Sequence, residues 1–358
     1  VFVNTNDDIQ AIIVPTHLKN RYQKLLEKYD GLVTDCVAEV DGIYYSLDSD
    51  THTAKVIHTA KDQSYDYYTG DIVIPAQITY QGQEYQIVEI AASAFRSCSI
   101  DSITLPEGLV TIGNRAFDYC TNLRFVDMPD TVNNLRHGAF AGCSNLRYVK
   151  LSENVRLMRN DLFYECTQLQ TVLLGSQIKN VGSDAFAKCE NLRTIYLPET
   201  VKKIGDGAFS GCRSLKEVRI PDSVHILDMS AFDGCYEMNS LILGPNISGL
   251  KGITIPDLVT SIGDMDHCSD ITIPDSVTSI GGMDSCSNIT IPDSMTSIGK
   301  MYGCSNMKIN FPKGIKSLYP ISGLKGITIP DSVTSMGYMD NCSNITIPDS
   351  VTSIGSMY

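Results

Sequence analysis

The 358-residue chain lacks the features that mark several common classes of protein. No apolar run approaches the roughly 18 residues that a membrane-spanning helix requires, so membrane insertion is not expected. Positive charge is in deficit, with 28 lysines and arginines against 41 aspartates and glutamates. The resulting net charge of −13 disfavours nucleic acid and anionic membrane surfaces as partners, because both would repel the chain.

Signatures of catalysis and of metal binding are also missing. There is no G-x-S-x-G, no H-E-x-x-H, no P-loop and no dinucleotide-binding glycine pattern. The chain has no C-x-x-C pair and its six histidines are scattered, so no metal site is expected. Asp48-Ser49-Asp50 begins like a calcium loop, but the central glycine and closing glutamate are absent, which favours a solvated turn. The sequence therefore predicts a protein that is not an enzyme and has no catalytic residue or cofactor.

What the chain does have is one cysteine position that recurs every 22 or 23 residues, with a phenylalanine three residues before each cysteine. The cysteines are Cys98, Cys120, Cys143, Cys166, Cys189, Cys212 and Cys235, and the phenylalanines are Phe95, Phe117, Phe140, Phe163, Phe186, Phe209 and Phe232. A fixed period in this range indicates a solenoid. A residue found once per coil stacks on its own copies, which predicts a ladder of buried thiols. Because neighbouring coils about 4.8 Å apart lie within the Cα–Cα range of a disulfide, sporadic disulfides between coils are the alternative.

The repeat divides into long and short coils. Residues 91–246 form coils of about 23 residues, in which Leu-x-x-Val-x-Leu predicts a strand, proline a turn and Gly-x-x-Ala-Phe-x-x-Cys one helical turn. Residues 247–358 form coils of about 18 residues that repeat ITIPDSVTSIG at 271–281 and 345–355. Cysteine or leucine keeps the ladder position there, and methionine or isoleucine replaces phenylalanine, as a thinner core demands. We expect one solenoid that continues through both zones.

The first 90 residues do not carry the repeat. Residues 1–35 are interpreted as a helical lead-in, with an amphipathic helix over 17–29. Residues 36–90 predict a β-rich cap over the open edge of the solenoid, with a hairpin turn at Gln81-Gly82. Because the chain starts at Val1 without an initiator methionine, a processed or trimmed fragment is expected. Tyr358 falls in mid-coil, which predicts either end-to-end self-contacts or a further downstream portion.

The long-coil pattern CxxLxxVxLPxxVxxIGxxAFxx resembles the BspA-type leucine-rich repeats of bacterial surface proteins. The segments VDGIYYSLDSD and GDIVIPAQITYQGQEYQIVEIAASAF resemble the lead-in to such arrays, and the resemblance covers about residues 40–358. The stretch AIIVPTHLKNRYQKL at residues 11–25 resembles the sequence that closes such an array, which implies that residues 1–35 are the tail of a preceding module. It implies a β-rich α/β solenoid: a right-handed leucine-rich-repeat array with long and then short coils and an N-terminal β cap. It also implies a non-catalytic protein, secreted or on a bacterial surface, that adheres to host matrix proteins, host cells or other bacteria.

The solvent side of the first strand in each coil is the predicted binding surface. Side chains alternate along a strand, so the residues between the inward valine and leucine face solvent. Several are aromatic or apolar and predict a stripe for a protein partner, although cross-strand stacking alone is the alternative. The stripe consists of Phe125, Tyr148, Leu173, Tyr196, Arg219 and Ile242.

In the short coils the same column is expected to hold a threonine ladder, namely Thr254, Thr272, Thr290, Thr328 and Thr346. This ladder is either a strand-compatible residue copied by duplication or a flat array for a periodic glycan. Three functions follow from the sequence. The first is protein binding or adhesion through the strand face. The alternatives are a passive spacer that projects another module and glycan binding along the threonine ladder.

Overall fold

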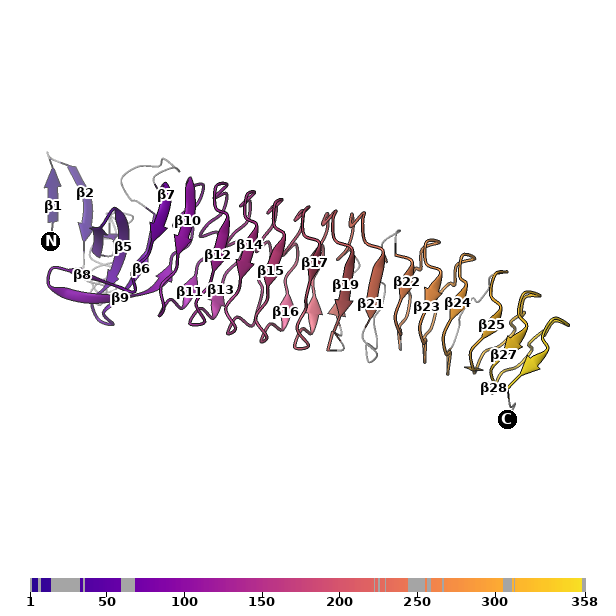
Figure 1. The fold of residues 1–358 in the computed structure, drawn as a ribbon. Helices are drawn as coiled ribbons and strands as arrows, with labels where there is room; N and C mark the ends of the chain where they lie inside the picture. Colours follow the sequence, from indigo (N-terminus) through magenta and orange to yellow (C-terminus); the bar gives the residue numbers. More distant parts are fainter. Residues whose placement is uncertain are drawn as a thin grey trace. The chain divides into compact units, whose positions relative to one another are not determined.

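The computed structural model describes residues 2–5, 8–13, 33–34, 36–58, 68–221, 223–224, 226–228, 230–243, 255, 259–265, 267–304, 311 and 313–355. Within these ranges the regular structure consists of strands and turns, and no helix is present (Figure 1). The chain forms two compact units, Val1–Val155 and Arg156–Tyr358, which are described separately. The helix predicted for residues 17–29 lies outside the described residues.

Unit 1 begins with a small sheet and a larger, mixed one. The small sheet contains β1 (Phe2–Thr5), β2 (Asp8–Ile13) and β3 (Val33–Thr34). The larger sheet has the order β13-β11-β9-β6-β5-β4, with β8 paired to β9. Its strands are β4 (Cys36–Val40), β5 (Ile43–Asp48), β6 (Thr53–Val56), β8 (Gln77–Tyr80), β9 (Gln83–Ile90), β11 (Thr111–Ile112) and β13 (Asn134–Leu135). The predicted hairpin is confirmed: Gln81 and Gly82, with φ of 52° and 82°, connect antiparallel β8 and β9.

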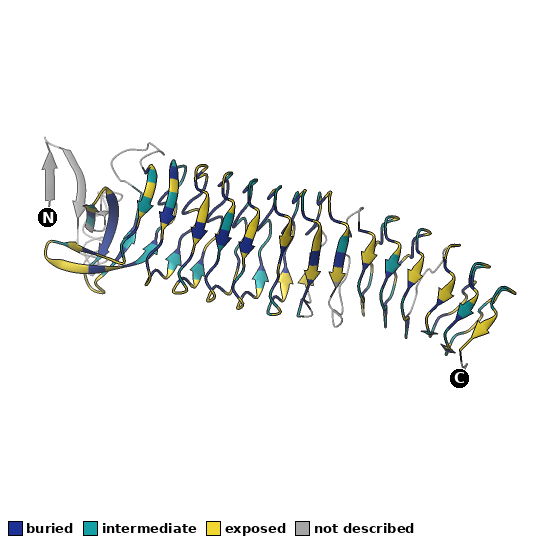
Figure 2. Cartoon of the chain, in the orientation of Figure 1, coloured by how far each residue is buried: buried dark blue, intermediate teal, exposed yellow. Residues whose placement is uncertain are grey.

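The coils of unit 1 carry a second set of parallel strands. These are β7 (Gly70–Val73), β10 (Ile100–Thr104), β12 (Phe125–Asp127) and β14 (Tyr148–Lys150). β7 pairs with β10 and β12 pairs with β14, both in parallel. Val126 and Val149 point into the coils and are buried, while their strand neighbours reach the surface (Figure 2). Because Ile112 pairs with Ile90 and with Leu135, the return stretch of each coil stacks on the next in the same way.

Unit 2 contains the remaining coils. Its strands are β15 (Thr171–Leu173), β16 (Asn180–Val181), β17 (Thr194–Ile195), β18 (Lys203–Ile204), β19 (Glu217–Ile220), β20 (Ile226–Leu227), β21 (Ser240–Leu243), β22 (Ser261–Ile262), β23 (Ser279–Ile280), β24 (Ser297–Ile298), β25 (Ser317–Leu318), β26 (Ile321–Ser322), β27 (Ser335–Met336), β28 (Met339–Asp340) and β29 (Ser353–Ile354). They form parallel sheets with the orders β16-β18-β20, β17-β19-β21-β22-β23-β24, β25-β27-β29 and β26-β28. The predicted boundaries at residues 35, 90 and 246 stay predictions.

A phenylalanine ladder forms the core of the long coils in each unit. In unit 1, Phe117 stacks on Phe95 and on Phe140, with ring centroids 5.1 Å apart in both pairs. In unit 2, the rings of Phe163, Phe186, Phe209 and Phe232 stack in sequence at 5.3–5.5 Å. All seven side chains are buried, because each coil contributes one ring at the same depth and parallel strands hold the coils at the stacking distance. The buried ladder predicted from the period is confirmed.

The turn that closes each coil is not helical, which corrects the α component of the predicted fold class. In a helical turn every amide would donate within its own segment. Here the amides alternate: that of Cys98 donates to the carbonyl of Phe95 at 3.1 Å, whereas that of Ser97 donates to Asp118 on the next coil at 2.7 Å. Ser93 and Ser97 each adopt a φ of 56°, which turns their amides toward that neighbouring coil. The closing segment is therefore a further inter-coil ladder, and the fold is a strand-rich repeat.

Candidate functional site

The strand face of unit 1 brings two predicted site residues together. Phe125 on β12 is 55% exposed, and its Cα partner on β14 is the half-buried Tyr148. Two residues further along the same strands, Lys150 forms an ion pair with Asp127 at 3.0 Å. The hydrogen bond to Asp127 raises the pKa of Lys150, so this ammonium group is charged at neutral pH. An aromatic patch therefore lies beside a neutralised charge pair.

A hollow that sequence reasoning missed adjoins this patch. It has a volume of about 390 Å³ and lies at the carboxyl ends of β10 and β12, where each coil turns at its proline. Leu105, Met128 and Pro129 contribute apolar atoms to it, and Glu107 and Asp130 add carboxylates. The signal in the sequence was the acidic residue that follows proline in both coils, at Glu107 and Asp130.

The strand face of unit 2 holds the other four residues of the predicted stripe. Tyr196, directly after β17, is 87% exposed, and Leu173 at the end of β15 is 48% exposed. Arg219 on β19 pairs in register with Ile242 on β21 and forms an ion pair with Glu199. Their spacing of 23 residues places all four at the repeat position of Lys150, whereas Phe125 and Tyr148 occupy the position two residues earlier. The six residues thus belong to two columns.

The threonine ladder does not continue the strand face, contrary to the expectation. Thr272 and Thr290 are Cα partners, as are Thr328 and Thr346, and all four are exposed. The sheet that contains β19 and β21, however, runs on into β22, β23 and β24, with Ser240, Ser261, Ser279 and Ser297 in register. Thr254 lies outside the described residues.

The physical reason is the short stretch between two ladder positions. Only 15 residues separate Cys235 from Leu250, so this coil has no room for the Val-x-x-Ile return stretch. The next such stretch, at Val259–Ile262 in sequence, pairs directly with β21. The strand face therefore passes from the Leu-x-x-Val-x-Leu segments of the long coils to the VTSIG segments of the short coils.

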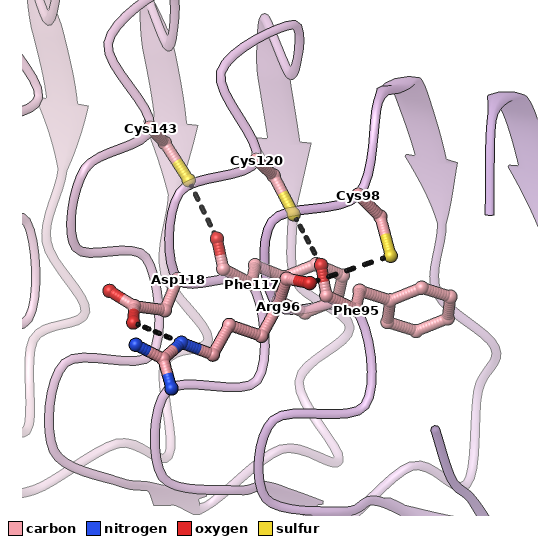
Figure 3. A network of polar contacts seen from close by, with 7 residues as sticks. All are labelled: Phe95, Arg96, Cys98, Phe117, Asp118, Cys120 and Cys143. Atoms are coloured by element: carbon pink, nitrogen blue, oxygen red, sulfur yellow. Dashed lines mark hydrogen bonds and ion pairs between the residues drawn. The ribbon is translucent and has the colours of Figure 1, made fainter. Parts of the chain in front are cut away.

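The described cysteines from Cys98 onward form a ladder of buried, reduced thiols, with Cys342 half-buried. In unit 1 two of the thiols donate a hydrogen bond to the preceding coil: Cys120 Sγ lies 2.9 Å from the carbonyl oxygen of Phe95, and Cys143 Sγ lies 3.1 Å from that of Phe117 (Figure 3). Cys98 Sγ donates within its own coil, to the carbonyl oxygen of Arg96 at 3.7 Å. The bond to the preceding coil recurs in unit 2 from Cys189, Cys212, Cys235, Cys286 and Cys304. Burial raises the pKa of Cys120 well above its usual value, which keeps the thiol protonated and able to donate. Sequence reasoning missed this polar role.

Polar groups inside the coils serve structure. Asp118 is buried and forms an ion pair with Arg96 of the preceding coil at 3.0 Å (Figure 3). Burial raises the pKa of Asp118, and the positive charges of Arg96 and Arg115 oppose that shift. The described residues contain no group of three or more histidine, cysteine or acidic side chains arranged to hold a metal ion. None of them forms a helix long and apolar enough to cross a membrane.

Several solved structures of leucine-rich-repeat proteins are similar to this chain. Among solved structures, a leucine rich cell surface protein from Faecalibacterium prausnitzii is 20% identical, with a TM-score of 0.49 over 90% of this chain and 95% of that one. A leucine-rich repeat protein from Bacteroides ovatus is 20% identical, with a TM-score of 0.42 over 88% and 90% of the two chains. The leucine rich repeat protein of T. pallidum is 27% identical, with a TM-score of 0.40 over 57% and 80%. No curated protein sequence matches the chain.

The sequence itself matches one family over most of its length. The family model for the BspA type leucine rich repeat region matches in six copies, over residues 88–198, 179–264, 246–317 and 265–358. The matched segments include the cysteine and phenylalanine ladders and both kinds of coil. The chain belongs to the BspA-type leucine-rich-repeat family.

Proposed function

We propose that this chain is a non-enzymatic protein of the bacterial cell surface that binds a protein partner through the strand face of its long coils. The observation that carries the proposal is the exposure of large side chains there: Tyr196 is 87% exposed and Phe125 is 55% exposed. A parallel strand buried on its inner side does not need an aromatic residue on its outer side. Exposed aromatic rings on a rigid scaffold are the residues that dominate binding energy when a partner covers them.

The rigidity of the strand face supports the same proposal. Val126, Val149 and Val218, which alternate with the exposed residues, are buried in the coils and fix the backbone beneath them. Side chains on such a scaffold lose little freedom when a partner binds, which favours affinity. The neighbouring ion pairs Asp127–Lys150 and Glu199–Arg219 provide polar groups at the edge of each patch. A protein surface with an apolar centre and a polar rim fits this arrangement.

The test starts from a panel of purified host matrix, serum and bacterial surface proteins, captured on the immobilised chain. For each captured protein, Kd is measured for the wild type, for Phe125→Ala with Tyr148→Ala in unit 1, and for Tyr196→Ala in unit 2. Loss of a central aromatic anchor is expected to weaken binding by about 2 kcal/mol or more, which is roughly 30-fold in Kd.

The matched control is Tyr236→Ala, which removes a tyrosine that is 66% exposed and lies outside the strands. It should leave Kd unchanged. If both sets of strand-face variants bind the captured protein as tightly as the wild type, the strand face is not the binding surface and the proposal is wrong.

Glycan binding by the short coils is a second candidate, because one observation favours it. The hydroxyls of Thr272, Thr290, Thr328 and Thr346 are exposed and make no hydrogen bond to the part of the chain that the structure describes. By contrast, the hydroxyls of Thr278 and Thr296 donate to the preceding coil at 3.2 and 3.0 Å. A glycan array with the wild type and with Thr272→Val plus Thr290→Val tests this candidate. Binding that is absent, or equal for both proteins, rules it out.

A passive spacer is the third function that the sequence suggested. The near-identical short coils support it for that zone, since uniform repeats add length without adding a distinct surface. Deletion of residues 265–358 should then leave the Kd of the captured protein unchanged. A weaker Kd would show that the short coils take part in binding.

A further inference from the structure

Two tyrosines from different short coils meet at the surface of unit 2. The hydroxyl groups of Tyr302 and Tyr338 are hydrogen-bonded to each other. Their rings are stacked, with centroids 6.1 Å apart and planes inclined by 21°. Tyr338 is 37% exposed and Tyr302 is half-buried, so both are accessible to solvent.

The pair spans a third coil. Met301 pairs with Ile321, and Ile321 pairs with Met339, so the coil that carries Ile321 lies between the two that carry the tyrosines. At the repeat positions of the two tyrosines this middle coil has Pro320 and Ser322. Neither side chain is long enough to separate the two phenols, which therefore lean toward each other above it.

We propose that Tyr302 and Tyr338 are the site of an intramolecular dityrosine cross-link, formed when a haem peroxidase and hydrogen peroxide act on the chain. Each phenol gives up one electron and one proton, and the two radicals couple through the ring carbons next to their oxygens. The hydrogens on those carbons then move to the oxygens and restore both phenols. The two electrons and two protons released convert one hydrogen peroxide to two waters.

The geometry favours this product because the two hydroxyls flank the new carbon–carbon bond in dityrosine. The hydroxyl–hydroxyl contact seen here therefore brings the carbons that couple to the same side of the pair. The bond to Tyr338, together with burial and the charges of Asp284 and Asp340, raises the pKa of Tyr302 to about 12. Tyr302 is thus a protonated phenol at neutral pH.

Competing sites of oxidation are few around the pair. The chain has no tryptophan. Met301 and Met339 are buried, and so is Cys304. Tyr196, Tyr236 and Tyr319 are more exposed than this pair, but none of them contacts another tyrosine ring within the described residues. In that part of the chain, a radical on any of the three lacks a stacked tyrosine ring with which to couple.

The cross-link would reinforce the part of unit 2 that has no phenylalanine ladder. In the short coils, methionine or isoleucine fills the position of phenylalanine, and each coil has about 18 residues in place of about 23. A bond between residues 36 positions apart closes a loop that includes the whole middle coil. Closing such a loop restricts the unfolded chain and so favours the folded one.

The experiment treats the dilute, folded chain with a haem peroxidase and one equivalent of hydrogen peroxide. We expect dityrosine fluorescence in the monomer and a mass loss of two hydrogens. Cleavage after lysine should then yield peptide 301–308 joined to peptide 326–358. Because the second peptide also contains Tyr358, the variants Tyr302→Phe and Tyr338→Phe identify the coupled rings.

Each of these variants should abolish the joined peptide, whereas Tyr319→Phe should retain it. Tyr319 is the matched control, since it is 55% exposed and lies on the middle coil. Circular dichroism of each variant establishes that it is folded. Absence of the joined peptide in the folded wild type, its persistence in either Tyr302→Phe or Tyr338→Phe, or cross-links formed only between molecules would overturn the proposal.

Discussion

Truncation of Phe117 to alanine measures how much the phenylalanine ladder stabilises unit 1. Phe117 is fully buried, and its ring stacks on Phe95 and Phe140 at 5.1 Å with interplanar angles of 5° and 3°. Loss of a buried phenylalanine ring costs about 3–5 kcal/mol of folding stability. Each stacked ring pair contributes about 0.5–1.5 kcal/mol beyond the stabilisation that comes from burying apolar area. Backbone hydrogen bonds between the closing segments, such as those from the amides of Phe95 and Phe117 to the carbonyls of Ala116 and Ala139, hold both neighbours and oppose their collapse into the cavity. We therefore expect a loss in the upper part of that range, about 4–5 kcal/mol.

The assay is urea unfolding followed by far-UV circular dichroism and by tyrosine fluorescence, since the chain has no tryptophan. Phe125→Ala serves as the control for loss of a phenyl ring at a site that is 55% exposed, and it should change the free energy of unfolding by less than about 1 kcal/mol. Phe117→Leu, which keeps most of the volume, should fall between the two variants.

The reasoning fails if Phe117→Ala costs no more than Phe125→Ala. Such a result would mean that the coils relax into the space of the lost ring, so that the ladder sets the shape of the coil without stabilising it. Because a coil of a repeat protein contacts only its neighbours, the loss should also be local. Amide hydrogen exchange should therefore increase most in the coils of Phe95, Phe117 and Phe140.

Three further predictions concern the inside of the coils. Gly113→Ala should destabilise the chain by about 2–3 kcal/mol in urea unfolding, because its Cβ would lie 2.5 Å from the backbone nitrogen of Ala92. Gly108→Ala, whose Cβ meets nothing within 4 Å, should cost only the strain of its positive φ, about 1 kcal/mol; equal losses would refute the steric explanation. In the native chain a thiol reagent should modify Cys342 much faster than the ten buried cysteines, because burial shields those ten thiols from the reagent; mass spectrometry of the labelled peptides checks this, and uniform labelling would contradict it. Burial raises the folded-state pKa of Asp118 above 3.8, so ionisation of Asp118 should destabilise the fold as pH rises through and beyond that value. The free energy of unfolding of Asp118→Asn minus that of the wild type should therefore increase from pH 3 to pH 6. A difference that does not change with pH would refute this role of Asp118.

Stacked core positions could be predicted from the sequence, because a period fixes them. A residue that recurs once per coil must lie beside its own copies, so the stacking of Phe117 and Cys120 on their copies follows from spacing, and their apolar character then predicts their burial. The alternation within β12, with Val126 inside and Phe125 outside, follows from the pleat. These predictions needed no knowledge of tertiary contacts.

The closing turn and the course of the strand face could not be predicted in the same way. Gly-x-x-Ala-Phe-x-x-Cys fits a helical turn as well as it fits a turn with left-handed residues, and only the inter-coil bonds of residues such as Ser97 decide between them. The pairing of Ser240 with Ser261 depends on which segment of the following coil lies beside β21 when that coil is shortened. Both outcomes are set by contacts between coils, on which a sequence pattern within one coil carries no information.

The hydrogen bonds of the thiols explain why the ladder position holds cysteine, which its small size alone does not explain. The carbonyl of Phe95 accepts the amide of Cys98 within its own coil and the thiol of Cys120 from the next one. A carbonyl oxygen has two lone pairs, and the second would otherwise stay unsatisfied in an apolar core. Leu324 fills the same position without a donor, so the bond contributes to the fold without being required for it.

The buried positions of the coils are constrained by stacking, whereas the exposed positions on the strand face can vary. This difference determines where a binding partner can be recognised. Inside the coils, stacking holds every copy to nearly the same residue, so the interior cannot distinguish one partner from another. In one column of the strand face of unit 2 the long coils vary from Leu173 to Tyr196 to Arg219, whereas in the column two residues earlier the short coils repeat serine at 261, 279 and 297. A surface that differs from coil to coil can select a protein of irregular shape, while a uniform column can match only a partner with the same repeat along its length. We therefore propose that selectivity for a single protein partner comes from the long coils.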